Sequence, residues 1–315
     1  MLSIYNNKIL AMNNPIKKAV SVSLGKPERD KKVQVKLNGV PLILERIGTG
    51  GDAQAARQLF TRLDGKVDAL SVGGVDLYVR IGSRDYPIRA ALKMIKEVHQ
   101  TPVVDGRLLK YVLESRVFEL AAVTAQKIPH FRRAFVPFGT DRIGLIKAVS
   151  EVADEVVIGD LMFMFGLPFP VYGLDNFLRL ARLLLPVAGF LPISILNPPG
   201  AKDKTPHPKY EEFWHSADLI AGDMHYIYKY SPEDLQGKFV VTNTTTDENL
   251  ELLRRRGVST VITTTPRYEG RSFGVNLMEA ALVAYSGEKR TLSMDELNKL
   301  IEEIKIKPSI QKLTD

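Results

Sequence analysis

The stretch AFVPFGTDRIGLIKAVSEVADEVVIGD, residues 134–160, decides the fold of the C-terminal part of this chain. An apolar run, Ala134–Phe138, leads through a polar turn into Arg142–Val152, where apolar residues recur at helical spacing. A second apolar run, Glu155–Ile158, follows directly. A strand, a helix and a second strand in this order form a βαβ unit, whose two strands lie parallel in one sheet.

The same alternation continues toward the C-terminus. Further strands are expected at Leu191–Leu196, Leu219–Ala221, Phe239–Thr242 and Thr260–Thr263. Further helices are expected at Leu174–Leu185, Tyr210–His215 and Asp247–Arg256. Strands that alternate with helices in this way predict a doubly wound, mostly parallel, Rossmann-like α/β sheet.

The N-terminal part predicts a smaller mixed α/β domain. Three strands are expected at Lys18–Leu24, Lys32–Leu37 and Pro41–Ile47, with Asn38-Gly39 as the hairpin turn between the last two. Asp52 can cap the helix that follows. The remaining elements are a strand at Val67–Val72, a hairpin around Gly82-Ser83, a helix at Arg89–His99, a strand at Thr101–Val104 and a long helix at Arg107–Lys127.

These elements predict three segments. They are a mixed α/β domain over residues 16–130, a Rossmann-like domain with a returning helix over residues 131–287, and a C-terminal helix and tail over residues 288–315. Ser293 and Glu296 have the spacing of a capping box at the start of the last helix. The tail Lys305–Asp315 is expected to fray.

Composition excludes several classes of chemistry. The chain has 315 residues and carries 43 Lys+Arg against 36 Asp+Glu, so its formal net charge is +7. It has no Cys, which excludes a cysteine nucleophile, disulfides and thiolate metal sites, and fits a cytoplasmic location. The positive charge suits a phosphate-bearing ligand or nucleic acid. No nucleic-acid-binding module surrounds the basic clusters, so we expect no nucleic-acid partner.

The most apolar stretch, Phe177–Leu196, is about as long as a membrane helix but carries Arg179 and Arg182. We expect a buried helix that breaks at Pro186, and no membrane partner. The preceding run, Leu161–Leu174, is interpreted as core, with a lid or the subunit contact of a homodimer as alternatives.

Polar residues follow the predicted strands of the second domain, at the edge where open α/β sheets bind ligands. These residues are Gly139, Thr140 and Asp141; Asp160; Asn197; Asp223 and His225; Asn243–Thr246; and Thr263–Thr265. Each alone is typical of a helix cap or a turn, but together they favour a cleft for a small anionic or polyol metabolite. We expect Asp141, Asp160, Asp223 and Asn243 to meet there.

The turn Gly139–Gly144 matches the dinucleotide-binding fingerprint in part. It has two glycines where G-x-G-x-x-G needs three, whereas Asp160 stands about 20 positions on, at the place of the ribose-binding acid. The candidate contacts of NAD or NADP are therefore Gly139, Thr140, Gly144 and Asp160, with Asn243 and Thr244 after a later strand.

Asp223-Met224-His225 is a candidate catalytic segment. If it is extended, residues i and i+2 share a face, and a carboxylate beside an imidazole can orient it for proton transfer. His207, His215 and His225 are an alternative metal-binding set. No carboxylate arrangement completes such a set, so we predict no metal site.

Four segments carry a family resemblance: Ser21–Gly25 (SVSLG), Glu45–Thr49 (ERIGT), Val156–Phe163 (VVIGDLMF) and Thr263–Arg267 (TTTPR). In them the chain resembles bacterial quinate 5-dehydrogenases, over most of its length. The resemblance implies a nicotinamide-dependent oxidoreductase of the quinate/shikimate type, with a substrate domain, a Rossmann domain and a C-terminal helix that returns to the first domain.

Residues 139–144 also resemble the N-T-D-x-x-G segment of shikimate dehydrogenases, whose aspartate acts with a lysine on the hydroxyl that is oxidised. The resemblance implies that Asp141 is catalytic. Gly139 stands where that family has asparagine, and the glycine-rich phosphate loop is absent. Lys110 is the candidate partner lysine by its distance along the chain.

We therefore expect an NAD(P)-dependent oxidoreductase that acts on a hydroxylated carboxylic acid. The alternative is a non-catalytic binding or regulatory protein that uses the same cleft for a small anionic metabolite.

Overall fold

The computed structural model describes residues 16–81, 84–123, 128–188, 205–265 and 274–314. The chain forms two compact units. Unit 1 comprises Met1–Leu77, Ala90–Gly106 and Val275–Ile304, and unit 2 comprises Tyr78–Arg89, Arg107–Gly274 and Lys305–Asp315. Each unit is thus assembled from segments that are far apart in the sequence, unlike the three consecutive segments expected from the sequence.

Unit 1 is built on a five-stranded sheet in the order β2-β3-β1-β4-β7. Its strands are β1 Lys17–Ser23, β2 Lys31–Leu37, β3 Val40–Gly48, β4 Ala69–Gly73 and β7 Val103–Val104. All neighbours pair in parallel except β2 with β3. The turn between β2 and β3 is the predicted one, because Asn38 and Gly39 both have positive φ, at 46° and 85°.

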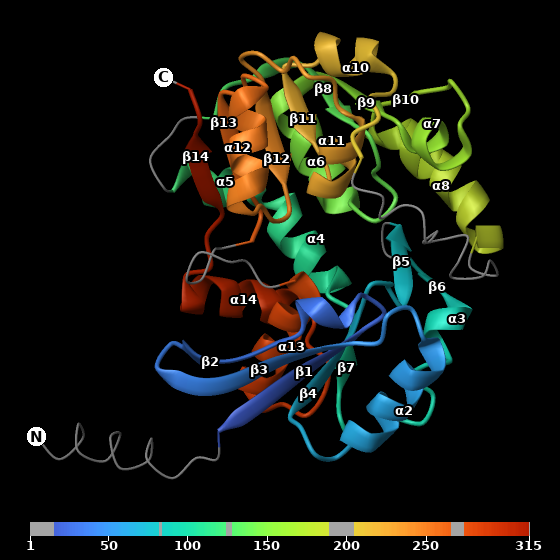
Figure 1. Ribbon diagram of the computed structural model, residues 1–315, viewed down its shortest axis with the longest axis vertical. Coiled ribbons are helices and arrows are strands. Elements are labelled where there is room, and N and C mark those ends of the chain that lie inside the picture. The colour runs from blue at the N-terminus through green and yellow to red at the C-terminus, as the bar shows by residue number, and fades with distance from the viewer. Residues whose placement is uncertain (1–15, 82–83, 124–127, 189–204, 266–273, 315) are drawn as a thin grey trace, which may run out of the picture. The chain divides into compact units, whose positions relative to one another are not determined.

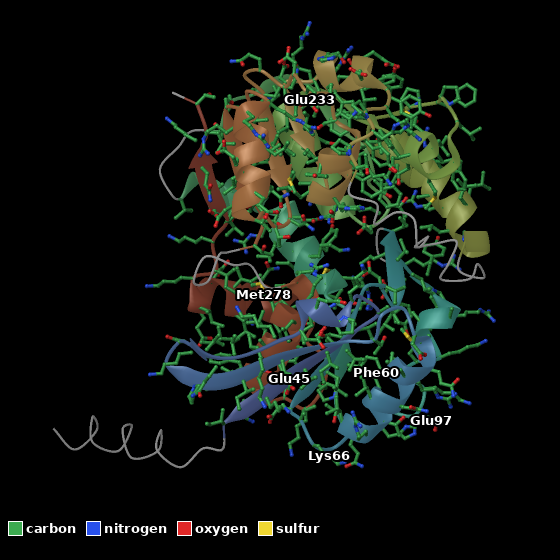
Figure 2. All side chains as sticks on the ribbon, viewed as in Figure 1. Glu45, Phe60, Lys66, Glu97, Glu233 and Met278 are labelled. Carbon is green, nitrogen blue, oxygen red and sulfur yellow. The ribbon has the colours of Figure 1, made fainter. Side chains whose placement is uncertain are left out.

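Three longer helices complete unit 1: α2 Ala53–Leu63, α13 Val275–Ser286 and α14 Met294–Ile304. Asp52 caps α2 as predicted, since its carboxylate accepts hydrogen bonds from the amides of Gln54 and Ala55. Phe60 of α2, labelled in Figure 2, is fully buried. The predicted capping box of α14 is confirmed, with reciprocal bonds between Ser293 and Glu296 of 2.8 and 3.2 Å.

The helix α13 packs across β1, β3 and β4. Residues Leu277–Ala284 are all buried, which is typical of a helix that is covered on every side. The helix α13 therefore belongs to the same unit as the N-terminal strands.

Unit 2 is a doubly wound α/β sheet of seven strands (Figure 1), in the order β10-β9-β8-β11-β12-β13-β14. The strands are β8 Phe131–Val136, β9 Ala153–Ile158, β10 Val171–Tyr172, β11 Leu219–Ala221, β12 Phe239–Thr242, β13 Thr260–Thr263 and β14 Ser309–Lys312. Strands β9, β8, β11, β12 and β13 are parallel, and the two edge strands are antiparallel. Counted from β8 the order is 3-2-1-4-5-6-7, so the predicted Rossmann-like fold is confirmed.

The helices of unit 2 are α4 Arg107–Ser115, α5 Val117–Ala122, α6 Ile143–Val152, α7 Asp160–Phe165, α8 Leu174–Ala188, α10 Glu211–Ser216, α11 Met224–Tyr230 and α12 Asp247–Arg255. Side chains alternate along the strands, so each sheet face has its own core. Ala134 and Val136 of β8 pack with α5, α6 and α8, whereas Phe135 packs with α10, α11 and α12. A hairpin of β5 Tyr78–Ile81 and β6 Arg84–Pro87 joins the first of these cores.

Several sequence predictions of secondary structure are wrong in instructive ways. The helix expected at Arg89–His99 is only α3, Arg89–Leu92. The long helix expected at Arg107–Lys127 is interrupted at Arg116, where φ is −113° and ψ is 11°. The helix α8 continues past Pro186 to Ala188. The strand expected at Leu191–Leu196 lies outside the described residues.

The tail expected to fray instead supplies β14, which pairs antiparallel with β13 along its whole length. The Leu161–Leu174 run divides between core and surface. Met162 is buried, whereas Met164, Phe165, Leu167 and Phe169 are exposed. A homodimer that uses these exposed side chains stays a prediction. Within the described residues, no helix has the length and apolar character needed to cross a bilayer.

Candidate functional site

The candidate site lies where the strand order of the unit 2 sheet reverses. From β8 the chain continues through α6 to β9 on one side, whereas β11 and β12 extend the sheet on the other. The turns that leave β8 and β11 diverge at this point, and open α/β sheets bind ligands there. The turn after β8 carries Asp141 and Arg142, and the turn after β11 carries Asp223.

Lys110 and Asp141 form an ion pair at this edge. Lys110 Nζ lies 3.0 Å from Asp141 Oδ2, and the two side chains are 13% and 32% exposed. Burial alone would raise the pKa of Asp141, but the charges of Lys110 and Arg142 outweigh burial and lower that pKa below its ordinary value. Asp141 is therefore anionic at neutral pH and holds the Lys110 ammonium in position.

The close approach of two helices brings Lys110 to Asp141. Helix α4 packs on α6. A Cβ at Gly144, in the first turn of α6, would lie only 2.6 Å from the carbonyl oxygen of Tyr111. Only glycine permits this separation, because an added methyl group would overlap the main chain of α4. Gly144 thus fixes the position of α4, and Lys110 directly precedes Tyr111 on that helix.

Arg142 links Asp141 to further polar residues. Its side chain is 4% exposed, its Nη2 lies 2.7 Å from Asp223 Oδ2, and its Nη1 pairs with Glu114 of α4. Asn243, which follows β12, donates a 2.8 Å hydrogen bond to the same Asp223 oxygen. Burial lowers the pKa of Arg142, but Glu114, Asp141 and Asp223 outweigh burial and raise it above its ordinary value.

Glu114 is the most deeply buried of these three acids. Its side chain is 1% exposed, and its Oε2 has no hydrogen-bond partner among the residues that the structure describes. Burial raises the pKa of Glu114 to about 7, although the charges of Arg142 and Lys110 oppose the shift. Near neutral pH the acid therefore exchanges between its ionised and protonated forms.

Asp160 is bound to the turn that precedes α6. Its carboxylate accepts 2.8 Å hydrogen bonds from the amides of Gly139 and Thr140, and it also accepts from Thr140 Oγ1. Burial raises the pKa of Asp160 to about 6 against these hydrogen bonds. Asp160 therefore fixes the turn. Its predicted contact with a ribose stays a prediction, as do the phosphate contacts of Gly139 and Thr140.

Hydroxyl side chains lie beside Asn243 at the ends of β12 and β13. Thr265 Oγ1 donates to the Asn243 carbonyl oxygen at 2.7 Å. Thr245 is buried, and its Oγ1 has no hydrogen-bond partner within the described part of the chain. Thr244, a predicted cofactor contact, is half-buried next to it. This rim offers a buried hydroxyl to a ligand, close to the residues that hold Asp223.

The predicted catalytic segment Asp223-Met224-His225 is not extended. Asp223 caps α11, and its Oδ1 accepts a 2.8 Å hydrogen bond from the backbone amide of His225. Because Met224–Tyr230 is helical, the two side chains do not share the face of an extended segment, and the catalytic roles of Asp223 and His225 stay predictions. Among the described residues, no group of three or more His, Asp or Glu side chains could hold a metal ion.

Arg142 and Glu114 were not among the site residues predicted from the sequence. The spacing of Lys110 and Glu114, i and i+4 on a predicted helix, was the signal that both lie on one face. A second omission is Tyr226, whose ring stacks on Phe138 with centroids 5.0 Å apart and an interplanar angle of 1°. Burial and, next, the charge of Asp141 raise the pKa of Tyr226, so its phenol stays protonated.

Unit 1 has a polar cluster of its own, without charges. Ser21 of β1 and Ser71 of β4 are register partners, and both are buried. Asn276 of α13 donates to their hydroxyl oxygens at 2.7 and 3.3 Å. Asp105, which follows β7, is also a buried residue of unit 1, where it accepts a 2.8 Å hydrogen bond from the amide of Leu77.

Fold and site together define unit 2 as a Rossmann-like α/β unit with a lysine–aspartate pair at its topological switch point. The chain belongs to the family described as Domain of unknown function (DUF8754), whose family model matches residues 108–313. A second model, Domain of unknown function (DUF8753), matches residues 18–105. No curated protein matches the chain.

Solved structures of several kinds are similar to the chain. The NAD-dependent malic enzyme of Thermotoga maritima is 14% identical over 96% of this chain and 79% of its own, with a TM-score of 0.39. The hetero-hexameric glutamate dehydrogenase of Thermus thermophilus is 12% identical over 92% and 73%, with a TM-score of 0.42. The arabinose-binding protein AraP of Geobacillus stearothermophilus is 10% identical over 91% and 99%, with a TM-score of 0.39. These similarities assign no activity to the chain.

Proposed function

We propose that the protein is an NAD(P)-dependent oxidoreductase that acts on a hydroxylated carboxylic acid, of the quinate or shikimate type. The observation that carries the proposal is the Lys110–Asp141 ion pair of 3.0 Å at the switch point of the unit 2 sheet. A lysine fixed by a carboxylate can exchange a proton with the oxygen of a carbon that changes between alcohol and ketone. The family resemblance at residues 139–144 supports the same roles.

In the oxidation direction, Lys110 Nζ in its neutral form takes the hydroxyl proton. In the reduction direction, the ammonium form returns that proton to the carbonyl oxygen. Asp141 stays anionic throughout, because Lys110 and Arg142 lower its pKa. It therefore stabilises the ammonium form and keeps the lysine aimed at the reacting oxygen.

A bound nicotinamide would accept or supply the hydride. The rim after β12 fits such a group, since Thr245 Oγ1 is a buried hydroxyl without a partner among the described residues. Asn243 and Thr244 are its predicted neighbours in that contact. The amides of Gly139 and Thr140 already donate to Asp160. A phosphate group at this turn would have to share these amides with the carboxylate.

Cofactor titration tests the proposal directly. We expect NADH or NADPH to change fluorescence on binding, and nicotinamide-dependent turnover to appear with quinate, shikimate or a related hydroxy acid. Absence of binding by either nucleotide at millimolar concentration would contradict the proposal.

The alternative function is non-catalytic binding of a small anionic metabolite, for which we expect a different result. In that case carboxylates or phosphate would raise the melting temperature of the protein by binding the folded state, while neither nicotinamide nucleotide would do so.

A further inference from the structure

Two further charged residues, Arg142 and Glu114, lie next to the Lys110–Asp141 pair, although the pair can form without them. Arg142 and Glu114 are 4% and 1% exposed, so both charges are buried. Replacing a buried ion cluster by apolar residues of similar volume is often neutral or stabilising. Stability alone therefore does not explain why unit 2 buries these groups beside the Lys110–Asp141 pair.

Arg142 joins three structural elements. It stands in the turn between β8 and α6, pairs with Glu114 on α4 through Nη1, and pairs with Asp223 at the start of α11 through Nη2. A planar guanidinium with donors on both sides suits such a bridge better than an ammonium, because its fork fixes two partners at once. Arg142 therefore sets how α4 and α11 lie relative to the turn that carries Asp141.

Not every polar atom of the cluster has a hydrogen-bond partner within the described part of the chain, although we would expect this of a purely structural network. Glu114 Oε2 and Arg142 Nε are buried polar atoms without a hydrogen-bond partner among the described residues. Arg142 Nε lies 4.0 Å from Asp141 Oδ1, within reach of its charge but beyond a hydrogen bond. Buried polar atoms are nearly always paired in proteins, so unpaired ones beside a candidate site point to a role in its chemistry.

We propose that Arg142 is a positioning residue, which Glu114 and Asp223 hold from two sides so that its guanidinium faces Asp141 and keeps that carboxylate aligned with Lys110. Glu114 and Asp223 orient the guanidinium, and the guanidinium charge acts on Asp141. The proposal extends the proposed function, since the pair that Arg142 aligns is the one assigned to proton transfer. The charged and titratable groups that interact with Asp141 are Lys110, Arg142, Glu114, Asp160 and Tyr226.

The test reads the protonation of Asp141 and needs no substrate. The full chain is labelled with ¹³C at aspartate carboxyls, Asp141 is assigned with Asp141→Asn, and the signal is followed by NMR between pH 2 and pH 8. We expect Arg142→Gln to move the midpoint of Asp141 upward by about 1–3 pH units, the effect of losing an opposite charge a few ångströms away. An unchanged midpoint in a folded Arg142→Gln protein would overturn the proposal.

Arg256 provides a matched control. Its side chain is 1% exposed, and it pairs with the exposed Glu233 at 3.1 Å (Glu233 is labelled in Figure 2), with a further hydrogen bond to Ser231. Arg256→Gln also removes a buried arginine from unit 2, so it should lower stability while leaving the midpoint of Asp141 unchanged. If both variants shift Asp141 equally, the role of Arg142 is merely structural.

Arg142→Lys keeps the positive charge but removes the planar guanidinium that can bind two partners at once. This variant replaces Arg142→Gln in the test if Arg142→Gln does not fold. We expect an Asp141 midpoint within about 1 pH unit of the wild type. If turnover is found, its kcat should fall about 100-fold, with a much smaller change in KM, since misplacement of a reacting group by about 1 Å has this cost. Unchanged kcat would contradict positioning. An Asp141 midpoint that shifts in Arg142→Gln, together with a wild-type protein that shows no turnover, would reject the proposed function while supporting the role of Arg142.

Discussion

The two buried polar clusters described above, one in each unit, are built in different ways. In unit 1, Ser21, Ser71 and Asn276 satisfy one another through neutral hydrogen bonds. In unit 2, Glu114, Arg142 and their neighbours bury full charges at the ends of β8 and β11. A neutral cluster holds strands and a helix together at any pH, whereas buried charges make a region sensitive to protons. Unit 1 also buries the acids Asp105 and Glu279, so the contrast is between the two clusters, and it favours the charged cluster of unit 2 for proton chemistry.

Substitution of Lys110 is expected to have the largest effect of the changes that test this contrast. Lys110→Met removes the proton-exchanging group and should reduce nicotinamide-dependent turnover about 10²- to 10⁴-fold, the usual contribution of general acid–base catalysis. The control is Lys147→Met, which removes an exposed lysine from α6 and should leave turnover unchanged. Steady-state kinetics of the two variants provide the measurement. Equal activity in both would remove Lys110 from the mechanism.

The second prediction concerns the pH dependence of stability. Glu114 has a folded-state pKa of about 7 against an ordinary 4.5. The folded state thus binds a proton more tightly than the unfolded chain, and stability is lost as pH rises through 7. Between pH 5 and pH 8 this loss amounts to about 2–3 kcal/mol in the wild type.

Glu114→Gln should not show this loss, because glutamine does not ionise. Urea unfolding of both proteins at pH 5 and pH 8 measures the difference. Asp160, with a pKa of about 6, contributes a loss of the same sign to both proteins and cancels in the comparison. Identical pH slopes would show that Glu114 does not titrate in this range.

The third prediction concerns the approach of α4 to α6. Gly144→Ala places a methyl group 2.6 Å from the Tyr111 carbonyl oxygen. It should destabilise the protein by about 1–3 kcal/mol through overpacking. Gly222→Ala is the control, since its new Cβ meets only Pro137, at an ordinary 3.4 Å. Thermal unfolding of both variants gives the comparison, and equal melting temperatures would contradict the packing argument.

The smallest effect is expected in the neutral cluster of unit 1. Asn276→Ala removes the donor to Ser21 and Ser71 and should cost about 1 kcal/mol, the net value of a typical hydrogen bond. The loss should be the same at pH 5 and pH 8, because no member of the cluster ionises. A loss that changes with pH would break the distinction between the two units.

The strands at the centre of the unit 2 sheet were predictable from the sequence alone. The predicted bounds of β11, β12 and β13 match the structure, because short runs rich in β-branched and apolar residues between polar turns have few alternatives. Strand β14 was not predictable, since Ser309–Lys312 lacks an apolar pattern and depends on pairing with β13. Such pairing is a property of the folded chain rather than of the segment.

The candidate site was predictable only in part. Asp141 stands out because a polar turn follows a strand and resembles a known segment. The ion pair that connects the Asp141 turn to Asp223 was not predictable, since Arg142 and Asp223 are 81 positions apart in the sequence. The helix α11 was missed because Asp223 was interpreted as part of an extended segment rather than as an N-cap. Contacts across such separations follow from packing, which propensity does not encode.

Strand β14 has a consequence for how the protein is made. The ribosome releases the chain from its N-terminus, so β13 emerges well before Ser309–Lys312, its antiparallel neighbour. Until Ser309–Lys312 appear, the nascent sheet presents an open hydrogen-bonding edge, through which partly made chains can associate with one another. Yield during translation should therefore depend on how quickly Ser309–Lys312 follow β13.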